Sequence, residues 1–233
     1  MHFFHKKPFF RAMIQILLKV YLPIKERISA RYYKKNSKKC LFMLQSILSE
    51  YSGIELFFVM YGTLLGIYRD NKLIRGDMDI DIGIFLKGGI IDISSFRKYM
   101  RKNKVELRHS FEVDQLGVIQ DTFILKGVRI DVAYLRHDNN CDISYLTYDD
   151  RNELNKVLLF PFHKIEKTRN YNFEDNMVRI PYDPEQYLED TYGSNWRTPD
   201  PNYVYWENPN SMKTEFRGKT IFYNKKGDIK RTL

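Results

Sequence analysis

A pattern of strand, turn, helix and second strand runs through the first half of the chain. Residues 54–61, IELFFVMY, form an apolar run with a single acid, which predicts a buried strand. Gly62 marks a turn, and the residues from Thr63 to about Asp70 predict a short helix. Residues 77–85, DMDIDIGIF, alternate strictly, which predicts a half-buried strand with acids on one face. The opposite, apolar face consists of Met78, Ile80, Ile82 and Ile84.

Helical patterns flank this segment on both sides. Residues 9–22 predict a helix that ends at a proline, and residues 24–50 predict a second one with apolar positions at helical spacing. A third helix is predicted over residues 93–103. Glycine-marked turns then separate three predicted strands: 104–113, 117–126 and 128–135.

The last third of the chain gives weaker signals. A helix is predicted to open near Pro184 and to end by Gly193, and residues 199–233 carry little periodicity. The whole pattern predicts an α+β fold with a mixed sheet, N-terminal helices and a loop-rich C-terminal part. We expect a helical arm over residues 1–50 and a catalytic domain over residues 51–233.

The charge is concentrated at one end of the chain. The net charge is +9, yet residues 1–40 hold eleven Lys or Arg and one acid, while the rest holds 27 basic and 28 acidic residues. The body is therefore not a nucleic-acid binder by bulk charge. The two cysteines form no CxxC motif, so neither a disulfide framework nor a structural zinc site is expected.

The basic arm has two readings. Its longest uncharged stretch near the start, residues 12–18, is far shorter than the roughly 20 residues that span a bilayer, and it lacks the pattern of a signal peptide. Basic residues mixed with Phe, Ile and Leu suit an anionic membrane surface. They suit equally well a solvated helix that packs on the body. The expected location is cytoplasmic, with the membrane's cytoplasmic face as a peripheral site.

The alternating acids are the first chemical signal. Residues two apart on a strand share a face, so Asp79 and Asp81 project together, and Asp77 can join them. Unpaired carboxylates at that spacing repel each other, and a hard divalent cation such as Mg²⁺ removes the conflict. Asp131 lies inside the apolar run GVRIDVAYL, where an unpaired carboxylate is costly, and can supply a third ligand if its strand adjoins residues 78–84.

The Gly62-Thr63 step is the second signal. A small residue between a strand and a helix lets backbone N–H groups approach phosphate oxygens, which the helix N-terminus also favours. Arg69 lies one to two turns further on and can bind a phosphate bidentately. A lone DxD is weak, but the combined order of strand, Gly-Thr, helix, acid strand and later acid is typical of a nucleotidyltransferase-type palm.

These segments resemble the LicD family, which includes bacterial phosphocholine transferases and fukutin-related proteins. YGTLLGIYRDNKLIRGDMDIDIGIF resembles the family's G-T-L-L-G-x-x-R motif followed by D-x-D-I-D. The later stretch from FPFHKIEK to YGSNWRTPDP is similar to the family's C-terminal motifs, so the likeness covers about residues 52–201. Two departures stand out: Arg75-Gly76 replaces the usual aromatic and proline, and Met78 interrupts the usual acid triplet.

The resemblance implies a nucleotidyltransferase-like palm and a reaction. A phospho-alditol or phosphocholine group would move from a CDP-linked donor to a hydroxyl of a glycan or lipid-linked glycan, releasing CMP. Two Mg²⁺ ions, or Mn²⁺ in their place, would be held by Asp79, Asp81 and Asp131. Gly62, Thr63 and Arg69 would meet the donor's phosphates. Asp131 or Asp77 would accept the hydroxyl proton, and Asp77's role stays open.

Two rival functions remain. The same fold can transfer a nucleoside monophosphate from an NTP to a small molecule or a protein. A degenerate palm can also serve as a non-enzymatic, membrane-associated partner in glycan assembly, although the intact acids argue against decay. For His163, two roles remain open: an ordinary place at the surface or in the core, or a contact with the donor or the acceptor. Tyr192, Gly193 and Trp196 have a structural role as a helix end and an aromatic plug over the palm, or else Trp196 or a nearby tyrosine stacks on cytosine or a sugar.

Overall fold

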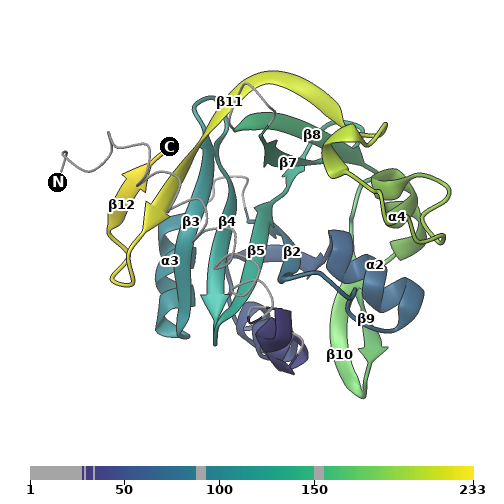
Figure 1. The fold of residues 1–233 in the computed structure, drawn as a ribbon, viewed down its shortest axis with the longest axis horizontal. Helices are drawn as coiled ribbons and strands as arrows, with labels where there is room; N and C mark the ends of the chain where they lie inside the picture. Colours follow the sequence, from purple (N-terminus) through teal and green to yellow (C-terminus); the bar gives the residue numbers. More distant parts are fainter. Residues whose placement is uncertain (1–27, 29, 34, 88–92, 150–154) are drawn as a thin grey trace, which may run out of the picture.

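The computed structural model describes residues 28, 30–33, 35–87, 93–149 and 155–233 (Figure 1). Helical residues 35–49 are followed by the helices α2 (Tyr61–Asp70), α3 (Ile93–Lys102) and α4 (Pro184–Tyr192) and a 3₁₀ turn, η2 (Tyr205–Glu207). The strands are β1 (Ile54–Val59), β2 (Asp79–Leu86), β3 (Val105–Val113), β4 (Gly117–Leu125), β5 (Val128–Tyr134), β6 (Arg136–His137), β7 (Asp142–Tyr148), β8 (Lys156–Phe162), β9 (Thr168–Phe173), β10 (Asn176–Pro181), β11 (Met212–Tyr223) and β12 (Ile229–Thr232).

Ten of these strands form one mixed sheet. Its order is β1-β2-β5-β4-β3-β11-β8-β7-β6, with β12 paired to β11, and β9 and β10 form a separate hairpin. The pairing of β2 with β5 is parallel, whereas the other strand pairs described are antiparallel. The prediction of an α+β fold with a large mixed sheet flanked by helices is confirmed.

The predictions for the first half of the chain hold closely. The three strands after α3 end within one residue of the predicted bounds. The predicted strand 54–61 ends earlier, at Val59, because the helix already begins at Tyr61. The acid strand begins only at Asp79: Met78 precedes it and is 42% exposed, so its predicted place on the apolar face is wrong. The predicted helix 9–22 lies outside the described residues.

The prediction of a loop-rich C-terminal part is wrong. After residue 135 the described residues form seven more strands, β6 to β12. β11 pairs with both β3 and β8, and most of its side chains are partly or fully exposed. Such a strand is held by its backbone ladder and not by one buried face, so it lacks the alternating pattern that predicts strands. Pro161 inside β8 also weakens the strand signal there.

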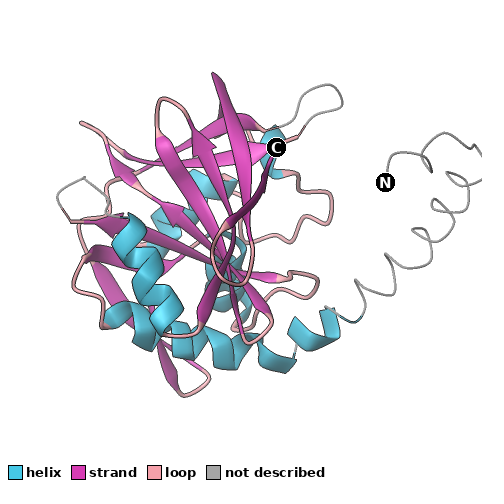
Figure 2. Cartoon of the chain, turned by 90° about the vertical axis from the view of Figure 1, so that its left-hand side faces the viewer, coloured by secondary structure: helices cyan, strands magenta, loops and turns pink. Residues whose placement is uncertain are grey.

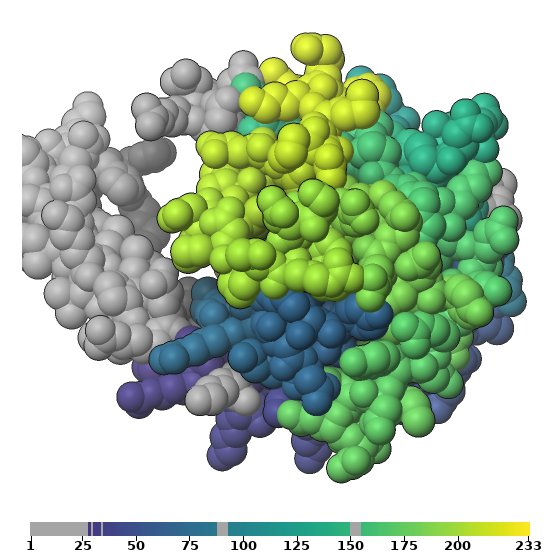
Figure 3. Space-filling model, turned by 90° about the vertical axis from the view of Figure 1, so that its right-hand side faces the viewer, coloured from purple at the N-terminus to yellow at the C-terminus, as the bar shows by residue number. Residues whose placement is uncertain are grey.

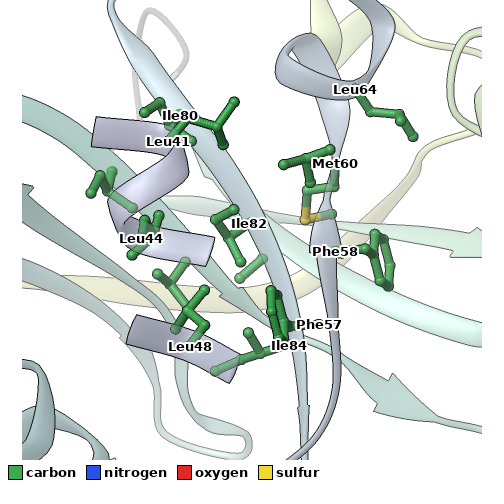
Figure 4. Close-up of a cluster of buried hydrophobic side chains, with 14 of the residues drawn as sticks. Leu41, Leu44, Leu48, Phe57, Phe58, Met60, Leu64, Ile80, Ile82 and Ile84 are labelled. Atoms are coloured by element: carbon green, nitrogen blue, oxygen red, sulfur yellow. The ribbon is translucent and has the colours of Figure 1, made fainter. Parts of the chain in front are cut away.

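The core lies between the helix over residues 35–49 and one face of the sheet. Figure 4 shows Leu41, Leu44 and Leu48 of this helix facing the isoleucines of β2, and all of these side chains are buried. The isoleucines are Ile80, Ile82 and Ile84. Since side chains alternate along a strand, the acids of β2 point away from this core, as predicted.

The remaining elements lie on both faces of the sheet. Figure 2 shows helices gathered along one side of the strands. Helix α3 packs on the core face: Arg97 Nη2 lies 2.7 Å from Asp121 Oδ1, and Asp121 is in register with Val132, which is on the face opposite to Asp131. Figure 3 shows the segment after α4, in yellow-green, lying directly over α2, in blue. Segments more than a hundred residues apart thus form one wall beside β2. Among the described residues, no helix is both long and apolar enough to cross a membrane.

Candidate active site

The turn between β1 and α2 is short and anchored to β2. Met60 alone separates the two elements, and Tyr61 adopts a left-handed backbone conformation, φ +45°, which costs energy for a residue with a side chain. The Met60 N–H donates to the Asp81 carbonyl at 3.1 Å, and the Asp81 N–H donates to Thr63 Oγ1 at 2.9 Å. Both backbone groups of Asp81 therefore fix the start of α2 against the acid strand.

Two carboxylates face the start of α2. Asp81 Oδ2 lies 3.4 Å from both the backbone nitrogen and Oγ1 of Thr63, where the helix N-terminus favours negative charge. A Cβ added to Gly62 would lie 2.8 Å from Asp77 Oδ2, so a larger residue here would displace the Asp77 carboxylate, whereas its distance of 3.7 Å from Asp81 Oδ2 is ordinary contact. Asp77 lies outside β2 and forms an isolated β-bridge with Arg75, so the prediction that a shared strand face aims it is wrong. The loop before β2 brings it to the site instead.

The parallel pairing of β2 and β5 supplies the third acid. Asp81 is in register with Asp131, and Asp79 is in register with Arg129. Asp131 is 8% exposed and accepts a hydrogen bond from Thr122 Oγ1 of β4 at 2.6 Å. The structure therefore brings together the predicted residues Asp79, Asp81 and Asp131, as the sequence argument required.

Arg129 bridges two of these acids. Its Nε and Nη2 donate to Asp131 Oδ1 and Oδ2 at 3.1 and 2.5 Å, and its Nε lies 3.6 Å from Asp79 Oδ2. Arg129 was not among the predicted site residues, although residues two apart on a strand share a face and Arg129 precedes Asp131 by two positions. Thr122 was missed as well, because it lies on a strand whose register cannot be predicted from the sequence alone.

The acids raise each other's proton affinity. Burial, followed by the charge of Asp131, raises the pKa of Asp79 from 3.8 to about 6, against the lowering effect of Arg129. Burial and then the charge of Asp79 raise the pKa of Asp81 well above its ordinary value, and burial raises the pKa of Asp77. One nearby arginine therefore does not neutralise this cluster.

A cavity of about 340 Å³ opens over Asp79, Asp81, Arg129 and Asp131. We call it the carboxylate cavity. Aromatic side chains make up much of its wall: Tyr61, Phe111, Phe160, Tyr192, Tyr203 and Tyr205. A negatively charged floor under aromatic walls suits a ligand with a phosphate, held through cations, and a flat or ring-shaped part that packs on the walls. Tyr203 and Tyr205 lie in an aperiodic stretch, so no sequence pattern indicated that they line this cavity.

A second cavity, of about 930 Å³, lies on the other side of the start of α2. Gly62 and Asp77 line it, together with Arg69 and Trp196, and it shares Tyr192 and Tyr203 with the carboxylate cavity. We call it the α2 cavity. Asp77 therefore lines a different cavity from Asp79 and Asp81, although its charge still contributes to the raised pKa of both acids.

The donor atoms suit a hard divalent cation, because they are carboxylate and hydroxyl oxygens on neighbouring strands. Within the ranges that the structure describes, however, no three Cys, His, Asp or Glu side chains are grouped closely enough to hold a metal ion. Arg129 occupies the oxygens of Asp131, which is the physical reason that this acid is not open to a cation in the present arrangement.

The remaining predicted residues lie apart from Asp79, Asp81 and Asp131. Arg69 binds both carboxylate oxygens of Asp70, at 3.1 and 3.0 Å, and its Nη1 donates to the Trp196 carbonyl at 3.3 Å. Trp196 is 5% exposed and packs beside Tyr68, which fits the predicted aromatic plug. His163 Nδ1 lies 2.9 Å from Asp190 Oδ2, and His163 lines neither cavity.

A comparison with models of known protein families identifies the family to which this chain belongs. Residues 55–183 match the model of the LicD/FKTN/FKRP nucleotidyltransferase domain, and this range includes the four predicted aspartates, Gly62, Thr63 and Arg69. The chain belongs to the LicD/FKTN/FKRP family. The family resemblance predicted from the two sequence motifs is thereby confirmed.

Similar curated proteins share this family. The chain is 25% identical to the human ribitol-5-phosphate transferase FKTN over 191 residues, which is 80% of this chain and 38% of the human protein. The proteins of the same name from Macaca fascicularis and Mus musculus are each 24% identical over the same length. This LicD-family chain thus spans well under half the length of these curated relatives.

Proposed function

We propose that this LicD-family chain transfers a phospho-alditol or phosphocholine group from a CDP-linked donor to a sugar hydroxyl of a glycan. The observation that carries the proposal is the meeting of Asp79, Asp81 and Asp131 at the start of α2, on the floor of an aromatic cavity. The names of the curated relatives support ribitol phosphate as the first group to test.

In the proposed reaction, the acceptor oxygen attacks the donor phosphorus that carries the alditol or choline. A new P–O bond forms to the sugar, and the P–O bond to the cytidine phosphate breaks, so that its electron pair leaves with CMP. Asp79, Asp81 and Asp131 would hold two divalent cations, Mg²⁺ or Mn²⁺, which would neutralise charge on the pyrophosphate. The Thr63 hydroxyl accepts a hydrogen bond from the backbone N–H of Asp81 and so helps to position this acid. Tyr192 and Tyr203 line the cavity and offer surfaces on which a base or a sugar can pack.

Asp77 is our candidate for the group that accepts the hydroxyl proton. It lines the α2 cavity, away from Arg129, and burial raises its pKa, as a general base near neutral pH requires. A sugar entering from the α2 cavity would meet Asp77, while the donor's phosphates lie over the other acids. Gly62, Thr63 and Arg69 remain proposed contacts of those phosphates, although Gly62 and Arg69 line the α2 cavity and Arg69 is held by Asp70.

The test is product release from defined donors. The purified chain would be incubated with CDP-ribitol, CDP-glycerol or CDP-choline, a glycan acceptor and Mg²⁺, and CMP would be measured by mass spectrometry. We expect CMP from one donor, with a loss of about 100-fold or more in Asp81→Asn and Asp131→Asn, since even partners of metal ligands cost about 10–100-fold. Asp138→Asn, an exposed acid outside both cavities, is the matched control.

Each other outcome points to a different function. Release of pyrophosphate from NTPs, with no CMP from any CDP-linked donor, would replace the proposal by nucleoside monophosphate transfer. Glycan synthesis that survives Asp81→Asn in cells but is lost when the protein is deleted would instead support a non-enzymatic partner.

A further inference from the structure

Arg129 places a positive charge beside the carboxylates of Asp79 and Asp131. In the part of the chain that the structure describes, it is the one lysine or arginine lining the carboxylate cavity. Its side chain is 45% exposed, whereas that of Asp131 is 10% exposed. The guanidinium is therefore open to solvent on the cavity side, while the carboxylate that it holds is buried in the sheet.

The present contacts of Asp131 compete with a cation. Oδ1 accepts from Thr122 at 2.6 Å and from Arg129 Nε at 3.1 Å, and Oδ2 accepts from Arg129 Nη2 at 2.5 Å. A bidentate guanidinium covers both oxygens on the side facing the cavity, and a cation close to it would also be repelled. Asp131 can therefore act as a cation ligand only after Arg129 releases it.

We propose that Arg129 is a two-position residue. Without ligands, it pairs with Asp131 and Asp79 and lessens their repulsion. When Asp131 holds a cation, Arg129 turns into the carboxylate cavity and binds phosphate oxygens of the substrate. The planar guanidinium suits both partners, because it presents paired N–H donors that match carboxylate and phosphate alike. The inference rests on the proposed function in taking the carboxylates as cation ligands and a phosphate as substrate.

Two binding measurements on Arg129→Met test this proposal, because one affinity should rise and the other should fall. In a titration with Mn²⁺ alone, removal of the competing guanidinium should raise affinity about threefold or more. With Mn²⁺ saturating, affinity for inorganic pyrophosphate should fall about tenfold or more, as expected for a lost hydrogen bond to a charged group. Arg129→Lys, which keeps the charge but not the paired donors, should fall between wild type and Arg129→Met in the second measurement.

Arg108→Met is the matched control. Arg108 is exposed on β3, so the substitution removes the same charge outside the cavity and should leave both affinities unchanged. If Arg129 only positions Asp131, both affinities fall together in Arg129→Met, and the proposal is overturned. Equal affinities in variant and wild type would overturn it as well.

A measurement on the wild type covers the case in which Arg129→Met does not fold. The Nε–Hε resonance of Arg129, assigned with Arg129→Lys, should shift on addition of Mg²⁺ and again on addition of pyrophosphate. A resonance that does not move in either step overturns the proposal. None of these measurements uses a CDP-linked donor, so failure of the proposed reaction would be recognised separately from failure of the Arg129 proposal.

Discussion

The burial and the mutual repulsion of the acids predict that the cation-free protein loses stability as pH rises. Burial and the charge of Asp131 raise the pKa of Asp79 to about 6, whereas an aspartate in an unfolded chain has a pKa of about 3.9. Between these values the folded protein binds more protons than the unfolded chain, so the free energy of unfolding decreases with rising pH. The stabilisation is fully present below about pH 4 and is lost once the pH passes about 6.

The expected size follows from the shift. A difference of about 2 pKa units corresponds to about 3 kcal/mol at 1.36 kcal/mol per unit. The raised pKa of Asp81, which the charge of Asp79 helps to cause, acts in the same direction. Asp79→Asn removes the titrating group and one source of repulsion, so the variant should become more stable than wild type at pH 7 in the absence of divalent cations.

Urea unfolding in EDTA, at half-unit steps from pH 4 to pH 7.5, measures the effect. The free energy of unfolding of wild type minus that of Asp79→Asn should decrease by about 3 kcal/mol across this range. Asp138→Asn, the exposed control, should show no such slope relative to wild type. A flat difference between wild type and Asp79→Asn would refute the reasoning, because the acids would then be too well solvated to repel each other. At pH 7, added Mg²⁺ should raise the free energy of unfolding of wild type by more than that of Asp79→Asn.

Three further changes test the architecture. Gly62→Ala places a Cβ 2.8 Å from Asp77 Oδ2, so it should displace this acid and lower kcat/KM for the CDP-linked donor by about 10–100-fold, measured by CMP release. Leu44→Ala, in the fully buried helix face of Figure 4, should lower the free energy of unfolding by about 2–5 kcal/mol in urea titrations and leave kcat unchanged at temperatures where the variant is folded. Arg69→Met should lower the free energy of unfolding by about 1–3 kcal/mol, because it removes the donor that Arg69 provides to Asp70 and to the Trp196 carbonyl. If the folded variant also binds pyrophosphate more weakly than wild type, Arg69 contacts the phosphate as well.

Local patterns were enough to predict half of the sheet and most of the acids. Alternation placed the isoleucines of β2 in the core and Asp79 and Asp81 opposite them, because residue parity on a strand decides the face. The same rule applied to residues 129 and 131 would have found Arg129. Asp77 shows the limit of the rule: the strand begins after it, and the loop that positions it carries no periodicity.

The C-terminal strands could not be predicted, for a physical reason. β9 and β11 expose side chains on both faces and are stabilised by backbone pairing, so their composition resembles that of loops. Tyr203 and Tyr205 reach the carboxylate cavity only because this part of the chain folds back over α2 (Figure 3). Because this wall is built from contacts between segments far apart in the chain, no local sequence pattern predicts it.

The parallel pair β2–β5 is the feature on which the site depends. Had the two strands paired one residue out of register, Asp131 would point to the face where Ile80 and Ile82 meet the helix over residues 35–49. That shift would bury an unpaired carboxylate, so the core itself selects the register that brings the acids together. The intervening helix α3 and the antiparallel strands β3 and β4 return the chain so that β5 runs parallel to β2. The hydrophobic packing on one face of this pair thus determines the close approach of like charges on the other.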